Sequence, residues 1–334
     1  MITAKPVPRQ ASRWQRELAQ AIGDPAELLR ELDLDPALLP AARAASACFP
    51  LRVPRGFVAR MRKGDPNDPL LRQVLPLGAE LTDAPGFGTD PTGDQAALAA
   101  PGVLHKYHGR ALLLVTGACA VHCRYCFRRE FPYAESGAGA APWRPALAYL
   151  RDDPSLREAI LSGGDPLSLS DRRLGALLTE LDRIPHLERL RIHSRQPIVL
   201  PERIDDGLLA VLASTRLQRV LVVHANHPRE IDGTVRAALR RLAAAGVILL
   251  NQAVLLRGIN DSAAVLAGLS EALFAASVLP YYLHLLDPVR GAAHFEVKES
   301  EASAIMEPLR QRLPGYLVPR LVRELPGQPA KTPV

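Results

Sequence analysis

From about residue 110 onwards, short apolar runs alternate with segments of helical pattern. The strand-like runs cover residues 111–115, 158–161, 190–193, 220–224, 247–254 and 279–285. Between them, apolar side chains recur at helical spacing over 171–183, 204–213, 232–245 and 262–276. Strands that alternate with helices predict a parallel sheet joined by right-handed crossovers.

The first hundred residues follow a different pattern. Apolar residues recur at helical spacing over 12–47, with a break and restart at Asp24-Pro25, and residues 84–102 are rich in Gly, Pro and Asp. We therefore predict an α/β fold in three parts. A helical N-terminal arm covers 1–100, a partial TIM-like (β/α)6 barrel covers 101–290, and a C-terminal segment covers 291–334.

Polar residues follow the ends of the predicted strands. In parallel α/β folds, ligands bind at the carboxyl ends of the strands, so these residues predict the site. They are Cys119 after the first strand, Ser162 to Asp165 after the second, His193 to Arg195 after the third, His224 and His227 after the fourth, Asn251 and Gln252 within the fifth and Asp287 after the sixth.

Three cysteines, Cys119, Cys123 and Cys126, have the spacing C-x3-C-x2-C directly after the first predicted strand. Thiolates suit zinc, copper(I) or iron–sulfur clusters. Three ligands on a four-iron cluster leave one iron open to a substrate or cofactor. A disulfide fits poorly because nothing in the chain indicates secretion. A zinc site remains an alternative, with His122 or Cys48 as the fourth ligand.

Composition narrows the class of protein. With 48% hydrophobic and 23% charged residues, the chain is typical of a globular protein with a large core. The net charge of +6 favours anionic ligands, but without a long Lys/Arg run and with only 5% aromatic residues we do not expect nucleic-acid binding. No apolar run approaches a membrane span, so we expect a cytoplasmic protein.

Other motifs leave alternatives open. Gly163 and Gly164 allow close backbone approach to a ligand, and the amides of this turn can receive one, although the motif alone favours a strand-to-helix turn capped by Asp165. His224 and His227 are too few to indicate a metal site by themselves. Lys331 follows the turn 326–330 near the end of the sequence. It is either an exposed terminal lysine or a Schiff-base lysine for pyridoxal phosphate (PLP).

Taken together, several motifs resemble the lysine 2,3-aminomutase family of the radical S-adenosylmethionine (SAM) superfamily. They are CAVHCRYCFRR at 119–129, SGGDPL at 162–167, HANHP at 224–228, NQAVLLRGIND at 251–261, YYLHLLD at 281–287 and PGQPAK at 326–331, with HKYHGRALLLV at 105–115 upstream. The segments 49–57, 63–76 and 290–295 are similar to the branch of elongation factor P (R)-β-lysylation proteins. The resemblance implies a [4Fe–4S] cluster, SAM and PLP as cofactors.

The resemblance also implies a role for each matching residue. Cys119, Cys123 and Cys126 would bind the cluster, and Lys331 would carry PLP in the C-terminal segment. The remaining positions are Tyr107 and Arg110 for the PLP phosphate, Gly163, Gly164, Asp165, His224 and Gln252 for SAM, Arg128 for the substrate carboxylate, and Asp287 and Glu324 for the substrate ε-ammonium. Glu324 stands where longer members have an aspartate, and its extra methylene is expected to weaken the affinity for free lysine.

By resemblance, the chain is an isomerase, an intramolecular aminotransferase that converts (S)-α-lysine to (R)-β-lysine. The product would be attached to elongation factor P by a separate lysyl ligase, and an electron donor would reduce the cluster. The tetramer of longer members is not expected, and a homodimer is considered. Two alternatives are an aminomutase acting on glutamate or another amino acid, and a non-catalytic iron–sulfur or zinc-binding protein.

Overall fold

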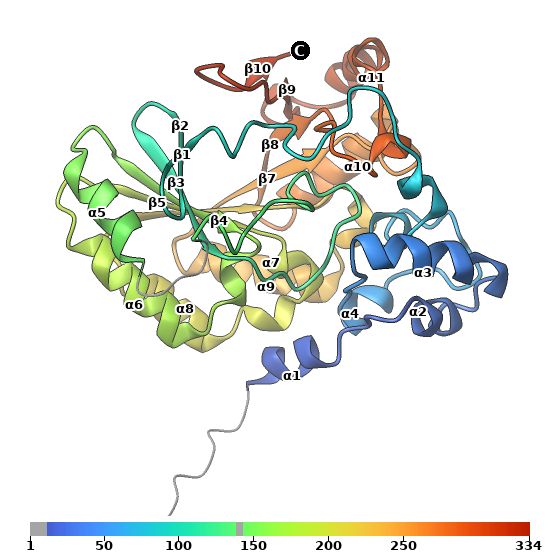
Figure 1. Cartoon of the computed structure of the whole chain (residues 1–334), viewed down its shortest axis with the longest axis horizontal. Helices are drawn as coiled ribbons and strands as arrows, with labels where there is room; N and C mark the ends of the chain where they lie inside the picture. Colours follow the sequence, from blue (N-terminus) through green and yellow to red (C-terminus); the bar gives the residue numbers. More distant parts are fainter. Residues whose placement is uncertain (1–11, 138–142) are drawn as a thin grey trace, which may run out of the picture.

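Among the residues that the structure describes, ten strands form one sheet and follow each other within it in sequence order (Figure 1). The structure, a computed structural model, describes residues 12–137 and 143–334. The strands from β3 to β9 pair in parallel. Antiparallel pairs lie at the two ends, where β1 (Leu98–Ala100) and β2 (Val103–Tyr107) precede β3, and β10 (Thr332–Pro333) follows β9. The prediction of a mostly parallel α/β fold is confirmed.

All six predicted strands are present within two residues of their expected ends. They are β3 (Arg110–Thr116), β4 (Glu158–Gly163), β5 (Arg189–Ser194), β6 (Gln218–Val223), β7 (Ile248–Val254) and β8 (Leu279–His284). A seventh parallel strand, β9 (Arg320–Arg323), was not predicted as a strand. Its four residues are too short to show a period of two, and only pairing with β8 defines it.

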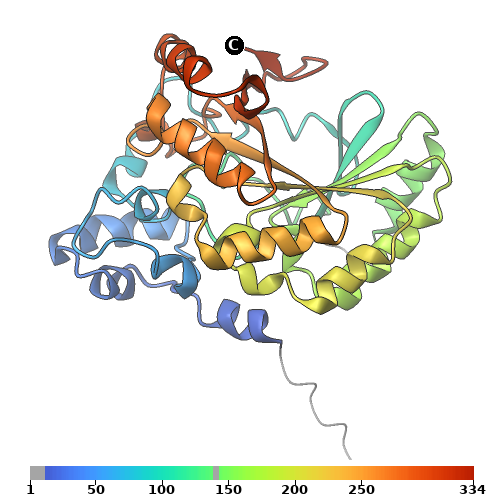
Figure 2. The same ribbon diagram turned by 180° about the vertical axis from the view of Figure 1, so that it is seen from behind.

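Helices follow the strands, and four of those described begin at a side-chain cap. They are α5 (Arg144–Asp152), α6 (Asp171–Asp182), α7 (Gln196–Val199), α8 (Asp206–Ala213), α9 (Gly233–Ala244), α10 (Ala263–Phe274) and α11 (Glu299–Arg312). Ser170, Asp205, Asp232 and Ser262 each accept a hydrogen bond from a first-turn amide, of α6, α8, α9 and α10 respectively. Viewed from behind, the yellow and orange helices lie across one side of the sheet (Figure 2).

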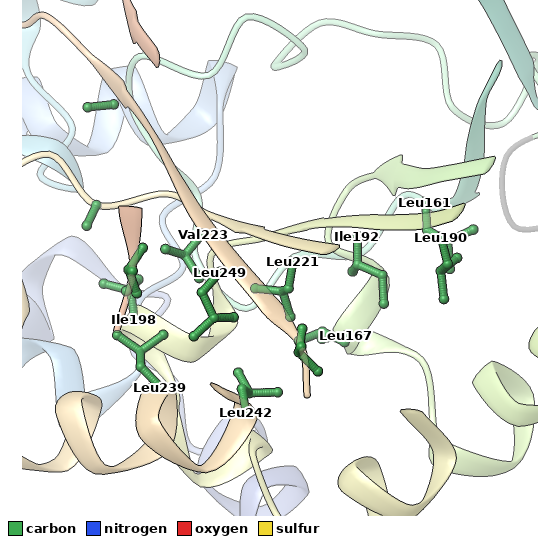
Figure 3. Close-up of a cluster of buried hydrophobic side chains, with 14 of the residues drawn as sticks. Leu161, Leu167, Leu190, Ile192, Ile198, Leu221, Val223, Leu239, Leu242 and Leu249 are labelled. Atoms are coloured by element: carbon green, nitrogen blue, oxygen red, sulfur yellow. The ribbon is translucent and has the colours of Figure 1, made fainter. Parts of the chain in front are cut away.

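Strand alternation gives the sheet an apolar face and a polar face. Leu190 and Ile192 of β5 are buried in the main hydrophobic core, which they share with Leu239 and Leu242 of α9 (Figure 3). Each such side chain contributes about 1.5–3 kcal/mol when fully buried. Arg191 and His193, the alternate residues of β5, instead line a cavity on the other face. The helices therefore cover one face and leave the other for a ligand.

The N-terminal arm packs against the cysteine loop. Its helices are α1 (Arg13–Ala19), α2 (Pro25–Glu31), α3 (Leu39–Cys48) and α4 (Arg55–Val58), and Asp24 caps α2 as its position before Pro25 predicts. The arm has its own apolar core, which includes Ala120 and Val121 of the cysteine loop. Two loop amides, those of His122 and Arg124, donate to carbonyls of the arm at 2.9 Å. The arm thus holds the loop in place, and the division at residue 100 stays a prediction.

The C-terminal segment continues the sheet. Leu317, Leu321 and Val322 are buried, whereas Leu325 is 40% exposed. Strand β10 turns back along β9, with Thr332 opposite Arg323. This turn brings Lys331, the preceding residue, to the cavity on the inner face of the sheet. In the part of the chain that the structure describes, no helix has the length and apolar character needed to span a membrane.

Candidate active site

One cavity of about 450 Å³ gathers the predicted site residues. The cysteine loop, the inner face of strands β3 to β8 and the C-terminal segment all contribute to its lining. The predicted residues that line it are Tyr107, Arg110, Cys119, Cys123, Cys126, Arg128, Gly163, Gly164, His224, Gln252, Asp287, Glu324 and Lys331. Residues up to 224 positions apart in the sequence, such as Tyr107 and Lys331, therefore share one site.

The three cysteines of the loop are free thiols at the cavity wall. Burial raises the pKa of the Cys119 thiol well above its usual range and that of Cys126 to about 11. Both are therefore protonated at neutral pH, and a metal would have to displace their protons. In the described residues, no three His, Cys, Asp or Glu side chains form the ligand set of a single metal ion. In a cubane cluster each thiolate binds a different iron, so the cysteine sulfurs lie farther apart than the ligands of a single metal ion.

The proposed fourth zinc ligands lie elsewhere. His122 Nδ1 is 2.8 Å from the Pro50 carbonyl, and its ring stacks on Phe49 at a centroid distance of 5.2 Å. Cys48 is exposed at the end of α3. His227 accepts the Arg229 amide and caps a short 3-10 helix, while His224 lines the cavity. These contacts account for His122 and His227 without a metal.

The two glycines after β4 bring the cysteine loop close. A Cβ at Gly163, whose φ is +120°, would lie 2.4 Å from the Thr116 carbonyl oxygen, and one at Gly164 would lie 2.5 Å from that of Ala118. The amides of Gly164 and Asp165 donate to these same two carbonyls, at 2.7 and 2.8 Å. Those amides are therefore used by the loop, whereas the sequence suggested that they would receive a ligand. The glycines are needed for backbone contact.

Asp165 lies behind the cavity wall. Its carboxylate accepts the Leu167 amide, the Ser194 hydroxyl at 2.8 Å and the Arg195 amide at 2.8 Å. Burial raises its pKa, although these donors oppose the shift. The structure thus gives Asp165 the capping role, joining the ends of β4 and β5.

Five charged side chains of alternating sign run from the cysteine loop to the C-terminal segment. Arg128 Nε is 2.6 Å from Asp94, whose other oxygen is 2.5 Å from Lys106 Nζ. Lys106 Nζ is 2.8 Å from Glu324, and the second Glu324 oxygen is 2.6 Å from Lys331 Nζ. We call this set the ion chain. Although burial raises carboxylate pKa values, the neighbouring cations lower those of Asp94 and Glu324 to about 2.

The pKa of Asp287 is shifted in the opposite direction. Burial and the nearby Glu324 carboxylate raise its pKa to about 7, despite Lys331 and Lys106. Asp287 is thus about half protonated at neutral pH. A cationic ligand placed beside it would shift it to the ionised form.

Three histidines present neutral rings to the cavity. Burial lowers the pKa of His224 to about 4 and holds those of His193 and His284 well below their usual range. The Nε2 atoms of all three are buried and lack a hydrogen-bond partner among the described residues. Buried polar atoms are rarely left in this state, so the three rings indicate a polar ligand in the cavity.

At the other end of the cavity, Arg110 lies over the Tyr107 ring at 4.8 Å. Arg191 of β5 is held by both oxygens of Glu158, at 2.5 and 3.2 Å. Tyr281 and Tyr282 of β8 lie with ring centroids 3.8 Å apart, and Lys331 Nζ is 5.9 Å from the Tyr282 ring. This end therefore combines aromatic surface with guanidinium groups, which suits a flat ligand that carries an anionic group.

Several cavity residues were not predicted as site residues. Asp94 and Lys106 had no separate signal, because one lies in a segment rich in Gly and Asp and the other in a short strand. Arg191 could have been found, since in β5 polar residues alternate with Leu190 and Ile192. His284 interrupts an apolar strand in the same manner.

Comparisons with known proteins place the whole chain among similar sequences. The L-lysine 2,3-aminomutase of Escherichia coli (strain K12) is 55% identical over 322 residues, 96% of this chain and 94% of that protein. The L-lysine 2,3-aminomutase of Haemophilus influenzae (strain ATCC 51907 / DSM 11121 / KW20 / Rd) is 47% identical over 332 residues, 99% and 98% of the two chains. No family model matches.

Among solved structures, a radical SAM methyltransferase from Sphaerobacter thermophilus aligns with a TM-score of 0.44 and 20% identity, over 66% of this chain and 68% of that chain. The two aminomutases are far more similar and extend over nearly the whole sequence. The chain therefore belongs to the L-lysine 2,3-aminomutase family.

Proposed function

We propose that this chain is a radical SAM, PLP-dependent aminomutase that converts (S)-α-lysine to (R)-β-lysine. The observation that carries the proposal is the cavity itself. It brings three thiols, a buried arginine, two carboxylates and the C-terminal lysine to one wall, in a chain 55% identical to an L-lysine 2,3-aminomutase.

The residues at the cysteine end fit a [4Fe–4S] cluster and SAM. Cys119, Cys123 and Cys126 would hold the cluster, which leaves one iron without a protein ligand. The unpartnered Nε2 of His224 and the side chain of Gln252 offer polar contacts for SAM. Gly163 and Gly164 shape the adjoining wall.

The residues at the opposite end fit PLP. Lys331 supplies the amine that would carry it, and Arg110 with Tyr107 would hold its phosphate. When bound, SAM and the cluster supply a 5′-deoxyadenosyl radical that abstracts hydrogen from the substrate, and PLP delocalises the resulting unpaired electron.

Arg128 is placed to bind the substrate carboxylate. It is 8% exposed, and Asp94 and Ser162 hold its Nε and Nη1, at 2.6 and 3.1 Å. Neither bond uses Nη2, so the guanidinium keeps a donor for a ligand in the cavity that Arg128 lines. The ion pair with Asp94 therefore orients Arg128 for carboxylate binding.

Glu324 and Asp287 are placed to bind the substrate ε-ammonium. Lys331 Nζ donates a hydrogen bond to one oxygen of Glu324 at 2.6 Å. A lysine that carries PLP no longer offers this ammonium, so the oxygen becomes available for the substrate. Lys106 continues to hold the other oxygen at 2.8 Å and fixes the carboxylate despite its extra methylene.

This pair of carboxylates also disfavours the glutamate alternative. The side chain of glutamate would place a third carboxylate near Glu324 and Asp287, and like charges at such a site are repelled. A non-catalytic metal-binding protein would have no use for the ion chain or for a lysine at the cavity wall.

We further propose that (R)-β-lysine serves the modification of elongation factor P through a separate lysyl ligase. The support is the similarity of segments 49–57, 63–76 and 290–295 to that branch of the family. An external electron donor is required to reduce the cluster, and the assembly is proposed to be no larger than a homodimer.

Borohydride reduction of PLP-loaded protein, followed by peptide mapping, tests the assignment of Lys331. We expect the pyridoxyl group on Lys331 and none on Lys106, the other lysine at the cavity. Lys331→Ala should lose PLP binding and lysine rearrangement but retain the iron–sulfur absorbance. A pyridoxyl group on any other lysine would refute the assignment.

A further inference from the structure

A buried arginine from the end of another strand, Arg195, contacts one of the cysteine thiols. Arg195 follows β5, is 5% exposed and lines the cavity. Its Nη1 donates to Cys123 Sγ at 2.8 Å and to the Tyr125 hydroxyl at 2.6 Å. The guanidinium therefore touches one of the three proposed cluster ligands directly.

A fixed set of acceptors holds this guanidinium in place. Arg195 Nη2 donates to Gln73 Oε1 at 2.5 Å and to Glu230 Oε2 at 3.1 Å. Glu230 is fully buried, and its other oxygen accepts the Asn226 and His227 amides. The arginine thus cannot turn away from Cys123 without breaking buried charged contacts, each expensive to lose.

One donor of Arg195 is still unused. Its Nε is buried and has no hydrogen-bond partner in the described part of the chain. Arg195 lines the cavity and also contacts Cys123, and its hydrogen-bonding capacity is not fully used by the described residues. Asp165 fixes the backbone on the same side, because it accepts the Arg195 amide at 2.8 Å.

We infer that Arg195 is a positioning residue for the iron–sulfur cluster and raises its reduction potential through the hydrogen bond to Cys123 Sγ. The inference rests on the proposed function, which supplies the cluster. Reduction adds one electron, and part of the added charge falls on the thiolate sulfurs. A nearby cation and N–H donor stabilise that charge, so they favour the reduced state.

Glu230 opposes this effect. Its carboxylate shares the Arg195 guanidinium and partly cancels the positive charge that Cys123 experiences. Substitutions of the two residues should therefore have opposite effects. Removing the guanidinium of Arg195 should lower the reduction potential of the cluster, and removing the charge of Glu230 should raise it.

The test is a redox titration with dithionite, monitored by electron paramagnetic resonance, on protein reconstituted with iron and sulfide. Arg195→Lys keeps a positive charge but loses the two parallel N–H donors of the guanidinium. We expect the ratio of reduced to oxidised cluster at a fixed potential to fall about tenfold, equivalent to about 59 mV for one electron. Glu230→Gln should shift the midpoint upward. Arg203→Lys, a fully buried arginine bound to Leu167, Leu169 and Asp171, is the matched control and should leave the midpoint unchanged.

The outcomes separate this inference from the proposed function. If the unsubstituted protein assembles no cluster, the proposed function fails. If the cluster assembles but Arg195→Lys and Glu230→Gln leave the midpoint where the control has it, the inference fails. Should Arg195→Lys not fold, an upward shift in Glu230→Gln supports the inference, and an unchanged or lower midpoint overturns it.

Discussion

Replacing Glu324 by Gln should loosen the C-terminal segment before any cofactor is bound. Glu324 lies directly after β9 and accepts both Lys106 and Lys331, at 2.8 and 2.6 Å. The three side chains are 16, 17 and 19% exposed, so water screens their charges only weakly. The substitution keeps the shape of the side chain and removes its charge.

The size of the effect follows from the pKa of Glu324. The two lysines hold it at about 2, against an ordinary value of 4.5. Since one pKa unit corresponds to about 1.4 kcal/mol, the ion pairs stabilise the ionised carboxylate by about 3 kcal/mol. Breaking one partner of a buried ion pair costs about 3–5 kcal/mol in other proteins, which agrees. Because the pKa is lower in the folded state, this stabilisation is complete above pH 4.5 and is lost as the pH falls towards 2.

Hydrogen exchange of PLP-free protein at pH 7 measures this effect locally. A loss of about 3 kcal/mol should accelerate exchange in β9 and β10 about 150-fold. Glu307→Gln is the control, because Glu307 is 67% exposed in its pair with Arg310, and such surface pairs contribute about 0–1 kcal/mol. Equal exchange rates in the two variants would refute the role of the ion chain.

Three further predictions concern the cavity. Replacing Cys119, Cys123 or Cys126 by Ala should abolish the cluster absorbance after anaerobic reconstitution, whereas Cys48→Ala should retain it; an equal loss in Cys48→Ala would show that the ligand set is wrong. Arg128→Lys should reduce kcat/KM for lysine by tenfold or more, because a point charge replaces a fixed fork; unchanged kinetics would argue against the carboxylate contact. Since the pKa of Asp287 is about 7, lysine should bind more tightly as the pH rises from 6 to 8, and Asp287→Asn should flatten that calorimetric profile; a profile that stays steep would assign it to another group.

The sequence predicted the parts of the fold that depend on local pattern. Apolar runs and caps such as Ser170 and Asp232 act within a few residues, so strands β3 to β8 and helices α6, α8, α9 and α10 were recognised, whereas α5 and α7 were not predicted. Strand β9 was missed because four residues carry too short a pattern and its pairing with β8 is a tertiary contact.

The site was predicted where a residue type is rare or lies at a strand end. The cysteines belong to this group, whereas the residues alone left Lys331 open between an exposed terminal lysine and a PLP lysine, and its assignment came from the family resemblance. The ion chain was not predicted, since Asp94 and Lys106 are 230 and 218 residues from Glu324 and nothing local indicates that they meet. For Asp165 the motif predicted a cap and the resemblance implied a SAM contact; its hydrogen bonds, including those to Ser194 and Arg195, support the cap, and the SAM contact stays a prediction.

The most direct test of the account is the product formed from lysine. Purified protein, reconstituted anaerobically with iron, sulfide and PLP, would be incubated with (S)-lysine, SAM and dithionite, and the amino acids separated by chiral chromatography. The account predicts (R)-β-lysine, absent when Lys331→Ala replaces the protein. Unchanged (S)-α-lysine from a preparation that contains both cluster and PLP, or β-glutamate formed from glutamate in its place, would contradict it.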